Sequence, residues 1–361
     1  MGGLKEGNMA IKIRKLEQKE QVYDITVEGN HNFYANDILV HNCSEIILPT
    51  SKDRTAVCCL SSVNLEYFDE WKNDKNFLYD VAEMLDNVLQ YFIDNAPKTI
   101  SRAVYSAKRE RSIGVGSLGF HAYLQSKMIP FESISARVAN KNMFMHIEKE
   151  LHSANLTLGK IRGEAPDAAG TGLRFSHTMA IAPNASSSII MGNTSPSIEP
   201  YKANAYRQDT LSGSFLAKNK FLNKILKERI GEDSQEIWSS IIANGGSVQH
   251  LECLTEDEKA VFKTAIEIDQ LWIIEHAAVR QEYIDQGQSV NVFFKPDVNV
   301  KYLHAVHFQA WKQGLKSLYY VRSSKLRKAD KVGQKVERRR IEDEIDMTSL
   351  VNNETCLACE G

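Results

Sequence analysis

The spacing of apolar residues changes near residue 42 and divides the chain into two parts. Before this point, short runs of alternating apolar and polar residues predict β-strands at Ala10–Ile13, Val22–Val27 and Ile38–Val40, with a turn at Glu28–Asn30. Beyond it, long amphipathic patterns at helical spacing alternate with brief apolar runs, which favours an α/β architecture. The first stretch is too short to enclose a core by itself, so we place a domain boundary after Asn42.

Two helices are predicted by their apolar spacing and their end signals. Apolar residues between Leu78 and Phe92 recur at helical spacing, and Pro97 stops the pattern. Thr255 and Glu258 have the spacing of a capping box, which predicts the start of a second helix. The apolar positions of this second helix continue towards Gly287 and are Val261, Phe262, Ile266, Leu271 and Ile274.

A strand, a helix and a second strand are predicted farther along the chain, at Val290–Phe294, about Val300–Trp311 and Leu318–Val321. This order is that of a βαβ unit, so parallel strands are expected. From Arg322 to Asp346 the chain is dense in charges with few apolar anchors, which predicts a solvated, mobile tail. The predicted domains are therefore 1–42, 43–321 and 322–361.

Composition narrows the class of protein. With 361 residues, 43% of them hydrophobic and 25% charged, the chain resembles an average globular protein with a sizeable core. A formal net charge of -2 gives no global field for nucleic acid or an anionic membrane. Without a run of about 18 apolar residues or a signal pattern, we expect neither a membrane span nor secretion, but a cytoplasmic protein of a bacterium or phage-infected host. Six unevenly spaced cysteines indicate redox chemistry rather than a disulfide scaffold.

The N-terminal stretch contains a specific group of polar residues. The segment Val22–Glu28, then His31 to Phe33, and finally Val40-His41-Asn42-Cys43 together resemble the last two sequence blocks of an intein. Taken singly, these residues are more often surface histidines and a turn asparagine. Their joint spacing favours the intein interpretation.

The resemblance implies a role for each of these residues in protein splicing. The side-chain amide of Asn42 attacks its own backbone carbonyl and cleaves the chain, while His41 polarises that carbonyl or protonates the leaving amine. Cys43 is the downstream nucleophile that accepts the upstream segment as a thioester. Asp24 and His31 support these proton transfers. Because only about 42 residues precede the junction, we expect a split intein whose other half, joined to the N-terminal half of the host protein, is a second polypeptide.

The chain from Cys43 onward carries a second resemblance. Residues 43–50, Cys-Ser-Glu-Ile-Ile-Leu-Pro-Thr, resemble the active-site loop of the ribonucleotide reductase large subunit, and the resemblance extends to the end of the chain. It implies the C-terminal half of the ten-stranded α/β barrel of that family. Cys43 would become the thiyl radical that takes the 3' hydrogen of the ribose. In an extended loop, Cys-x-Glu spacing puts both side chains on one side, so Glu45 is the candidate base for the 3' hydroxyl. The family places an Asn two residues before this Cys, where this chain has His41.

Two further cysteine segments match the same family. Cys58-Cys59-Leu60 to Leu65 matches the segment with one of the two cysteines that become a disulfide in each turnover, which implies that role for Cys58. Its disulfide partner would lie in the N-terminal half. Cys356 and Cys359 match the shuttle pair that re-reduces the site and is itself reduced by thioredoxin or glutaredoxin. A lone C-x-x-C can instead be half of a metal site, but no second pair completes one, and no metal site is predicted.

Two more segments complete the resemblance. Tyr319 and Tyr320 match the stacked tyrosine pair that relays a radical from the di-metal centre of the small subunit, although a Tyr-Tyr pair in a strand is more often packing. Met179 to Ala182 predicts a strand followed by a helix, whose N-terminal N–H groups and hydroxyls form an anion site. In the family this segment holds the substrate diphosphate, here at Asn184, Ala185, Ser186, Ser187 and Ser188. The downstream segment Ser197 to Pro200 matches as well.

Three other features are interpreted as structural. Gly114, Gly116 and Gly119 satisfy the G-x-G-x-x-G dinucleotide pattern, but residues 108–111 before them are no buried strand. We therefore interpret the segment as a packing loop before a helix. His121 and Cys253 have no identifiable partners in the sequence and are expected to be structural.

The combined interpretation is a large-subunit fragment of ribonucleoside-diphosphate reductase that carries an intein fragment. It would bind no cofactor of its own, would take its radical from the small subunit, and would act after joining its N-terminal half, where effector sites are expected. One alternative is a cobalamin-dependent reductase, which shares the barrel and cysteines but does not need Tyr319 and Tyr320. Another is a protein-ligation module with a decayed passenger, but the retained Cys58 and tail pair speak against it.

Overall fold

The computed structural model describes residues 32–35, 38–41, 44–210, 213–231 and 235–323. The chain divides into two compact units, Met1–Asn42 and Cys43–Gly361. In the first unit, β1 (Asn32–Ala35) and β2 (Ile38–His41) pair as an antiparallel hairpin with Asn32 opposite His41. The predicted strand at 38–40 is confirmed, whereas those at 10–13 and 22–27 and the turn at 28–30 lie outside the described residues.

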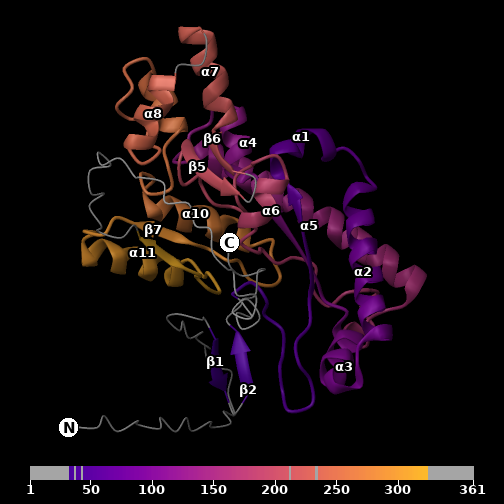
Figure 1. Cartoon of the computed structure of the whole chain (residues 1–361). Helices are drawn as coiled ribbons and strands as arrows, with labels where there is room; N and C mark the ends of the chain where they lie inside the picture. The colour runs from indigo at the N-terminus through magenta and orange to yellow at the C-terminus, as the bar shows by residue number, and fades with distance from the viewer. Residues whose placement is uncertain (1–31, 36–37, 42–43, 211–212, 232–234, 324–361) are drawn as a thin grey trace, which may run out of the picture. The chain divides into compact units, whose positions relative to one another are not determined.

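The second unit contains two pairs of parallel strands, one of which is drawn in orange in Figure 1. Strand β3 (Cys59–Asn64) pairs with β4 (Ile113–Leu118), and β7 (Val292–Phe294) pairs with β8 (Val321–Ser323), both in parallel. Residues 177–181 lie between these two pairs. The Ile113 N–H donates to the His177 carbonyl at 3.1 Å, and Ile181 forms a parallel bridge with Gln288. The predicted α/β architecture with parallel strands is therefore confirmed.

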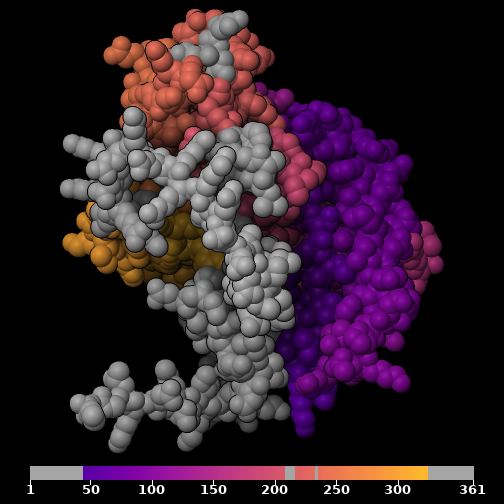
Figure 2. Space-filling model, viewed as in Figure 1, coloured from indigo at the N-terminus to yellow at the C-terminus, as the bar shows by residue number. Residues whose placement is uncertain are grey.

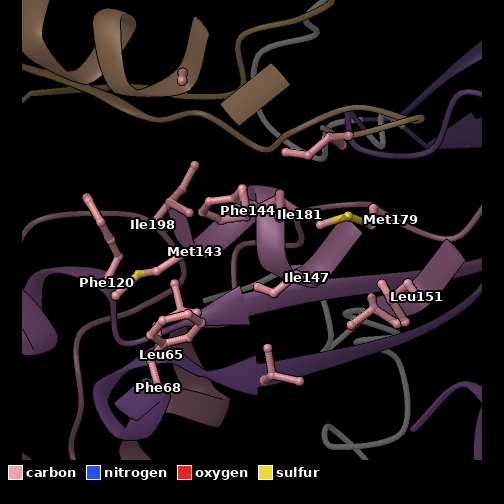
Figure 3. Packing of buried hydrophobic residues seen from close by; sticks show 14 of the residues in the cluster. Leu65, Phe68, Phe120, Met143, Phe144, Ile147, Leu151, Met179, Ile181 and Ile198 are labelled. Atoms are coloured by element: carbon pink, nitrogen blue, oxygen red, sulfur yellow. The ribbon is translucent and has the colours of Figure 1, made fainter. Parts of the chain in front are cut away.

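Long helices pack against these strands and enclose the main core. They are α2 (Phe77–Asn95), α3 (Ser101–Glu110), α4 (Phe120–Ser126), α5 (Ile134–Arg162) and α10 (Gln270–Gln281), with short helices η1 (Leu65–Tyr67), α1 (Phe68–Trp71), η2 (Lys98–Ile100), η3 (Pro166–Ala168) and α6 (Ala185–Ile190). Figure 3 shows Phe120, Phe144 and Ile147 of α4 and α5 among the apolar residues of this core. Burial of this apolar surface is the main stabilising contribution to the unit.

A smaller lobe has a core of its own. It contains the hairpin of β5 (Ala205–Thr210) and β6 (Gly213–Lys218) with α7 (Lys220–Ile230), α8 (Gln235–Ala243) and α9 (Glu256–Val261). Its centre is Trp238, which is 1% exposed and packs among Leu222, Leu226 and Phe262. In the space-filling view the pink and orange residues of this lobe gather at the top, apart from the indigo flank that carries α2 (Figure 2).

Of the helices predicted at 78–92, at about 300–311 and from Thr255 towards Gly287, the first two are confirmed and the third is wrong. Helix α2 ends before Pro97, and α11 (Val300–Lys312) connects β7 to β8 as the βαβ pattern requires. The capping box of Thr255 and Glu258 is present, but its helix stops at Val261 and α10 starts anew at Gln270. The break arises because the Ala265 N–H donates to the Tyr201 carbonyl at 2.8 Å, and because the Asp269 side chain caps a new helix at the Leu271 N–H.

The glycine-rich segment is also different from the prediction. Residues 113–118 are the buried strand β4 rather than a loop, and helix α4 follows Gly119, whose φ is 84°. A Cβ atom at Gly114 would lie 2.4 Å from Leu60 Cδ2 and 2.9 Å from Ala180 Cβ. At Gly116 it would lie 2.7 Å from the Ala180 carbonyl oxygen. Glycine is used here because neighbouring side chains and backbone approach closely, which explains a strand despite its low β-propensity.

Among the described residues, no helix is both long and apolar enough to cross a membrane.

Candidate active site

The loop that follows residue 43 is held against the segment 286–289. Ser44 and Glu45 are buried, and the Gly287 N–H donates to the Glu45 carbonyl at 2.8 Å. The Ser289 hydroxyl donates to Glu45 Oε2 at 2.6 Å, which orients the carboxylate. A Cβ at Gly287 would lie 2.4 Å from the Ser44 carbonyl oxygen, so only glycine permits this approach. Cys43 itself lies outside the described residues.

Cys58 lies directly before β3 and faces the same segment. The Gln286 amide donates to Cys58 Sγ at 3.4 Å, and the Ser112 hydroxyl donates at 3.5 Å. Burial raises the pKa of the Cys58 thiol to about 11, and these two hydrogen bonds oppose that rise. The thiol is therefore protonated near neutral pH. Burial also raises the pKa of Cys59, and Arg111 nearby opposes it.

Tyr319 and Tyr320 form a close pair just before β8. Their ring centroids lie 3.9 Å apart and their hydroxyl oxygens 3.0 Å apart. The Tyr319 N–H donates to the Val290 carbonyl at 2.8 Å, and the Tyr320 N–H donates to Asn291 Oδ1 at 2.9 Å. The pair is therefore anchored on the continuation of the segment that holds Glu45.

A buried carboxyl group lies behind this pair. Glu199, from the segment Ser197 to Pro200, is 5% exposed and accepts a hydrogen bond from Asn291 Nδ2 at 2.5 Å. Burial raises the pKa of Glu199 to about 6, against the opposing charges of Lys202 and Arg322. The Arg322 guanidinium also lies over the Tyr320 ring, with Cζ 4.8 Å from the centroid. Asn291 thus connects a titratable group to the tyrosine pair.

The predicted phosphate segment forms the start of a short helix. Asn184 precedes α6 with φ 52°, and its Nδ2 donates to Ser62 Oγ at 2.7 Å and to the Ser117 carbonyl at 3.2 Å. These bonds fix the helix start to β3 and β4. Ser186 and Ser187 are exposed, whereas Ser188 is buried and donates to the Ala185 carbonyl at 2.7 Å. The predicted helix is confirmed, but the predicted strand at Met179 to Ala182 is wrong, because only an isolated bridge between Ile181 and Gln288 is present there. The first N–H groups of a helix attract anions.

The structure thus connects four predicted residues, Glu45, Cys58, Tyr319 and Tyr320, to the segment 286–291 by hydrogen bonds. Asn184 is bonded instead to β3 and β4. His41 is the last residue of β2 in the first unit. Asp24, His31, Asn42, Cys43, Cys356 and Cys359 lie outside the described residues. Within the part of the chain that is described, no cluster of His, Cys, Asp or Glu could hold a metal ion.

Sequence reasoning missed the residues that connect this site. Gln286, Gln288 and Ser289 form a buried polar run directly before the predicted strand at 290–294, Asn291 lies within that strand, and this run was the available signal. His121 is structural as expected, since it is fully buried and its Nδ1 accepts the Tyr201 N–H at 2.9 Å. Burial lowers the pKa of His121 to about 3, which keeps it neutral.

Comparison with known sequences decides the family. A family model described as "Ribonucleotide reductase, barrel domain" matches residues 22–169 and 166–321. The chain belongs to this family. The match to the ribonucleotide reductase barrel domain starts at residue 22, upstream of Asn42, and therefore overlaps the segment that resembles an intein.

Individual relatives of the reductase family are close in sequence. The ribonucleoside-diphosphate reductase large subunit of Invertebrate iridescent virus 6 is 58% identical over 325 residues, covering 89% of this chain and 34% of the relative. That of Invertebrate iridescent virus 3 is 59% identical over 292 residues, covering 80% and 46%. The Actinobacillus ureae class Id ribonucleotide reductase alpha subunit is 44% identical with a TM-score of 0.74, covering 78% of this chain and 52% of that one. The chain spans between a third and about half of these relatives.

Proposed function

We propose that this chain supplies the radical cysteine, the base and one redox cysteine of a ribonucleoside-diphosphate reductase. The observation that carries the proposal is that Glu45 and Cys58 are both hydrogen-bonded to residues 286–289. The same extended segment continues to Asn291, which contacts Tyr320. Activity requires the part of the large subunit that this chain does not span.

The reaction would replace the ribose 2' hydroxyl by hydrogen. Cys43, as a thiyl radical, takes the 3' hydrogen, and the Glu45 carboxylate accepts the proton of the 3' hydroxyl. The 2' hydroxyl leaves as water after taking a proton from one of the two redox cysteines, and Glu45 later returns its proton to the 3' oxygen. Cys58 and a second cysteine from the remaining part of the subunit give up two electrons and two hydrogens and become a disulfide, and Cys43 recovers its hydrogen from the 3' position.

The disulfide would be reduced again by the tail pair, Cys356 and Cys359, through thiol–disulfide exchange. Thioredoxin or glutaredoxin would then reduce the tail pair. The substrate diphosphate would bind where α6 starts, at Asn184 to Ser188, because the first N–H groups of a helix attract anions.

The radical would come from a small subunit whose di-metal centre supplies the oxidising equivalent. Tyr319 and Tyr320 would relay it to Cys43. An exposed apolar stripe on α11 supports a protein partner beside this pair. Val300, Phe308 and Trp311 are 77%, 46% and 54% exposed, and the stripe lies on the helix that leads to Tyr319.

We further propose that residues up to Asn42 are the C-terminal part of an intein. In this proposal Asp24 and His31 assist proton transfer, His41 activates the carbonyl of Asn42, and Cys43 receives the upstream segment. Spacing of the five residues supports this proposal. The family match begins at residue 22, so the alternative is that residues 22–42 belong to the reductase barrel. The splicing experiment distinguishes these two interpretations.

The experiment that tests the reductase proposal is Cys43→Ser in the complete large subunit assembled with its small subunit. The expected result is a folded protein that binds ribonucleoside diphosphate and makes no deoxyribonucleotide, because a serine O–H bond is too strong for the relay to oxidise. Cys253→Ser is the matched control, since Cys253 lies in the smaller lobe and should leave turnover unchanged. Measurable turnover by Cys43→Ser would remove Cys43 from the mechanism.

Assays of the same assembled enzyme also distinguish the proposed reductase from a cobalamin-dependent reductase. A cobalamin-dependent enzyme would turn over without a small subunit once cobalamin is added, and it would tolerate loss of the tyrosine hydroxyls. The close contact of Tyr319 and Tyr320 favours the small-subunit route.

A further inference from the structure

Gln286 has a place in the site that the proposed mechanism does not use. Its side chain is fully buried, and the two ends of its amide contact different elements. Oε1 accepts the Ile47 N–H at 3.3 Å, and Nε2 donates to Cys58 Sγ at 3.4 Å. One amide group therefore joins the loop that carries Glu45 to the redox thiol.

The neighbouring contacts do not duplicate this connection. Of the loop and the redox thiol, Gly287 and Ser289 contact only the loop, at Glu45 and, for Ser289, also at the Ser44 hydroxyl (3.0 Å). Ser112 contacts Cys58 and Gln286 but not the loop. Among the described residues, Gln286 is the single side chain that hydrogen-bonds to both elements. Its loss would leave each of them anchored separately.

The orientation of the Gln286 amide is determined by its partners. The Ile47 N–H needs an acceptor, and the Ile113 carbonyl, 3.3 Å from Nε2, needs a donor. Exchanging the oxygen and nitrogen of the amide would place donor against donor and acceptor against acceptor. The N–H that points at Cys58 is therefore fixed in place.

The backbone of Gln286 is held as firmly as its side chain. Its N–H donates to the Met179 carbonyl at 3.2 Å. Its carbonyl accepts hydrogen bonds from Lys316 Nζ at 2.8 Å and from Gln281 Nε2 at 3.2 Å. A backbone bonded at both groups restricts the movement of the Gln286 side chain and so keeps its two contacts in place.

We propose that Gln286 is a positioning residue that keeps the Cys58 thiol and the Glu45 loop in register with each other. The positioning role assigned to Gln286 rests on the proposed reductase function. Its contacts with the Ile47 N–H and with Cys58 Sγ, however, can be measured in this chain without any turnover. A failure of the reductase assay would therefore leave this proposal standing, and its own failure would leave the reductase proposal standing.

Two substitutions of Gln286 separate the two contacts. Gln286→Met removes both. Gln286→Glu keeps an acceptor for the Ile47 N–H but removes the donors to Cys58 Sγ. Ser112→Ala is the matched control, since it removes the other donor to the sulfur and leaves the loop contact intact. It also removes the hydroxyl that accepts from Gln286 Nε2 at 3.4 Å, whereas the Ile113 carbonyl still holds that amide nitrogen.

Two readouts on the full chain follow the contacts. Hydrogen exchange of the Ile47 amide reports on the loop. We expect it to be about tenfold faster in Gln286→Met and unchanged in Gln286→Glu and Ser112→Ala, since a lost hydrogen bond of about 1.4 kcal/mol corresponds to tenfold. The ratio of iodoacetamide labelling at Cys58 to that at Cys59, measured on separate peptides, reports on the sulfur. We expect it to fall about threefold in Gln286→Glu and Ser112→Ala, as an upward pKa shift of about half a unit requires.

Either of two results would overturn the proposal. One is unchanged Ile47 exchange in a folded Gln286→Met chain. The other is an unchanged labelling ratio in Gln286→Glu. If Gln286→Met does not fold, Gln286→Asn takes its place, because an amide one methylene shorter withdraws from both partners, and the same two criteria apply.

Discussion

The hydroxyl oxygens of Tyr319 and Tyr320 lie 3.0 Å apart, although neighbouring residues of a regular strand point to opposite faces. The contact is possible because β8 begins only at Val321. In the two preceding residues the Tyr320 N–H donates to the side chain of Asn291 rather than to a strand carbonyl. The irregular backbone thus creates a short path between two phenols.

Removing either hydroxyl should stop the proposed radical relay. We expect Tyr319→Phe and Tyr320→Phe each to lower turnover of the assembled enzyme at least about 100-fold, or about 2.7 kcal/mol in the barrier, because phenylalanine keeps the ring but cannot be oxidised reversibly. Deoxynucleoside diphosphate formation is the measurement. Tyr206→Phe is the control, since its hydroxyl bonds to Asn193 Oδ1 away from the pair. Full turnover by either variant would reduce the pair to packing.

The exposed stripe of α11 should contribute to binding of the small subunit. Phe308 and Trp311 have ring centroids 5.5 Å apart and are both exposed. We expect the double substitution Phe308→Ala with Trp311→Ala to raise the Kd for the small subunit at least about tenfold, since aromatic anchors dominate interfaces. Titration calorimetry measures it, with the exposed Met145→Ala on α5 as control. An unchanged Kd would place the partner elsewhere.

The tail cysteines should matter only for the protein reductant. With Cys356→Ser and Cys359→Ser together, we expect turnover with thioredoxin to fall to about one equivalent per site, while turnover with a small dithiol is retained, because a small dithiol reaches the disulfide directly. The assay is product per enzyme over time with each reductant. Equal loss with both reductants would show that the pair is no shuttle.

Splicing should depend on Asn42. Mixed with an N-terminal counterpart that carries the rest of the intein, the chain should give a product joined at Cys43 that lacks residues 1–42. In Asn42→Ala a branched intermediate on Cys43 should accumulate, because the branch forms before asparagine cyclisation. Mass spectrometry distinguishes the two. Absence of both species, with folded partners under reducing conditions, would assign residues 22–42 to the reductase barrel instead.

Glu199 should make stability depend on pH. Its pKa is raised to about 6 by burial, so the folded state binds its proton more tightly than the unfolded chain, whose value is near 4.5. The stabilising contribution is present below pH 4.5 and is lost as the pH rises through 6, by about 2 kcal/mol at most. Glu199→Gln should remove this part of the pH dependence while it keeps an acceptor for Asn291. Urea unfolding at pH 4.5 and 7 tests it, and an identical pH dependence in the two proteins would contradict it.

Local pattern was sufficient for much of the fold. The apolar period between Leu78 and Phe92, the capping box at Thr255, and the strand–helix–strand order after Val290 each reflect interactions within a short stretch of chain. The break between α9 and α10 was not predictable in this way, because it depends on the Tyr201 carbonyl, more than 50 residues away in sequence. The strand β4 was missed for the same reason, since its glycines are explained by Leu60 and Ala180, which lie more than 50 residues away in sequence.

The residues of the candidate site were predicted from their resemblance to the motifs of a known family, and the local pattern of apolar and polar residues did not indicate them. Glu45 and Cys58 were found because their neighbours in sequence match a known arrangement. Gln286 and Ser289 were missed because a buried polar run resembles a loop until the segments on either side of it are placed. Their partners, Ile47, Cys58 and Glu45, are more than 220 residues away in sequence.

Gly114, Gly116 and Gly287 each occur where another backbone or side chain comes within 3 Å of the missing Cβ. Gly114 and Gly116 allow β4 to lie close to residues 180–181, and Gly287 allows its segment to lie close to the Ser44 carbonyl. In a saturation mutagenesis library selected for deoxyribonucleotide supply, these three positions should therefore accept no replacement, not even alanine. The solvent-facing Gly192 has nothing within 4 Å of the place a Cβ atom would take, so it should be limited by its positive φ of 82° alone and should tolerate asparagine. Gly163 also has open space, but its φ of 87° and ψ of 158° are essentially restricted to glycine, so it should tolerate no replacement.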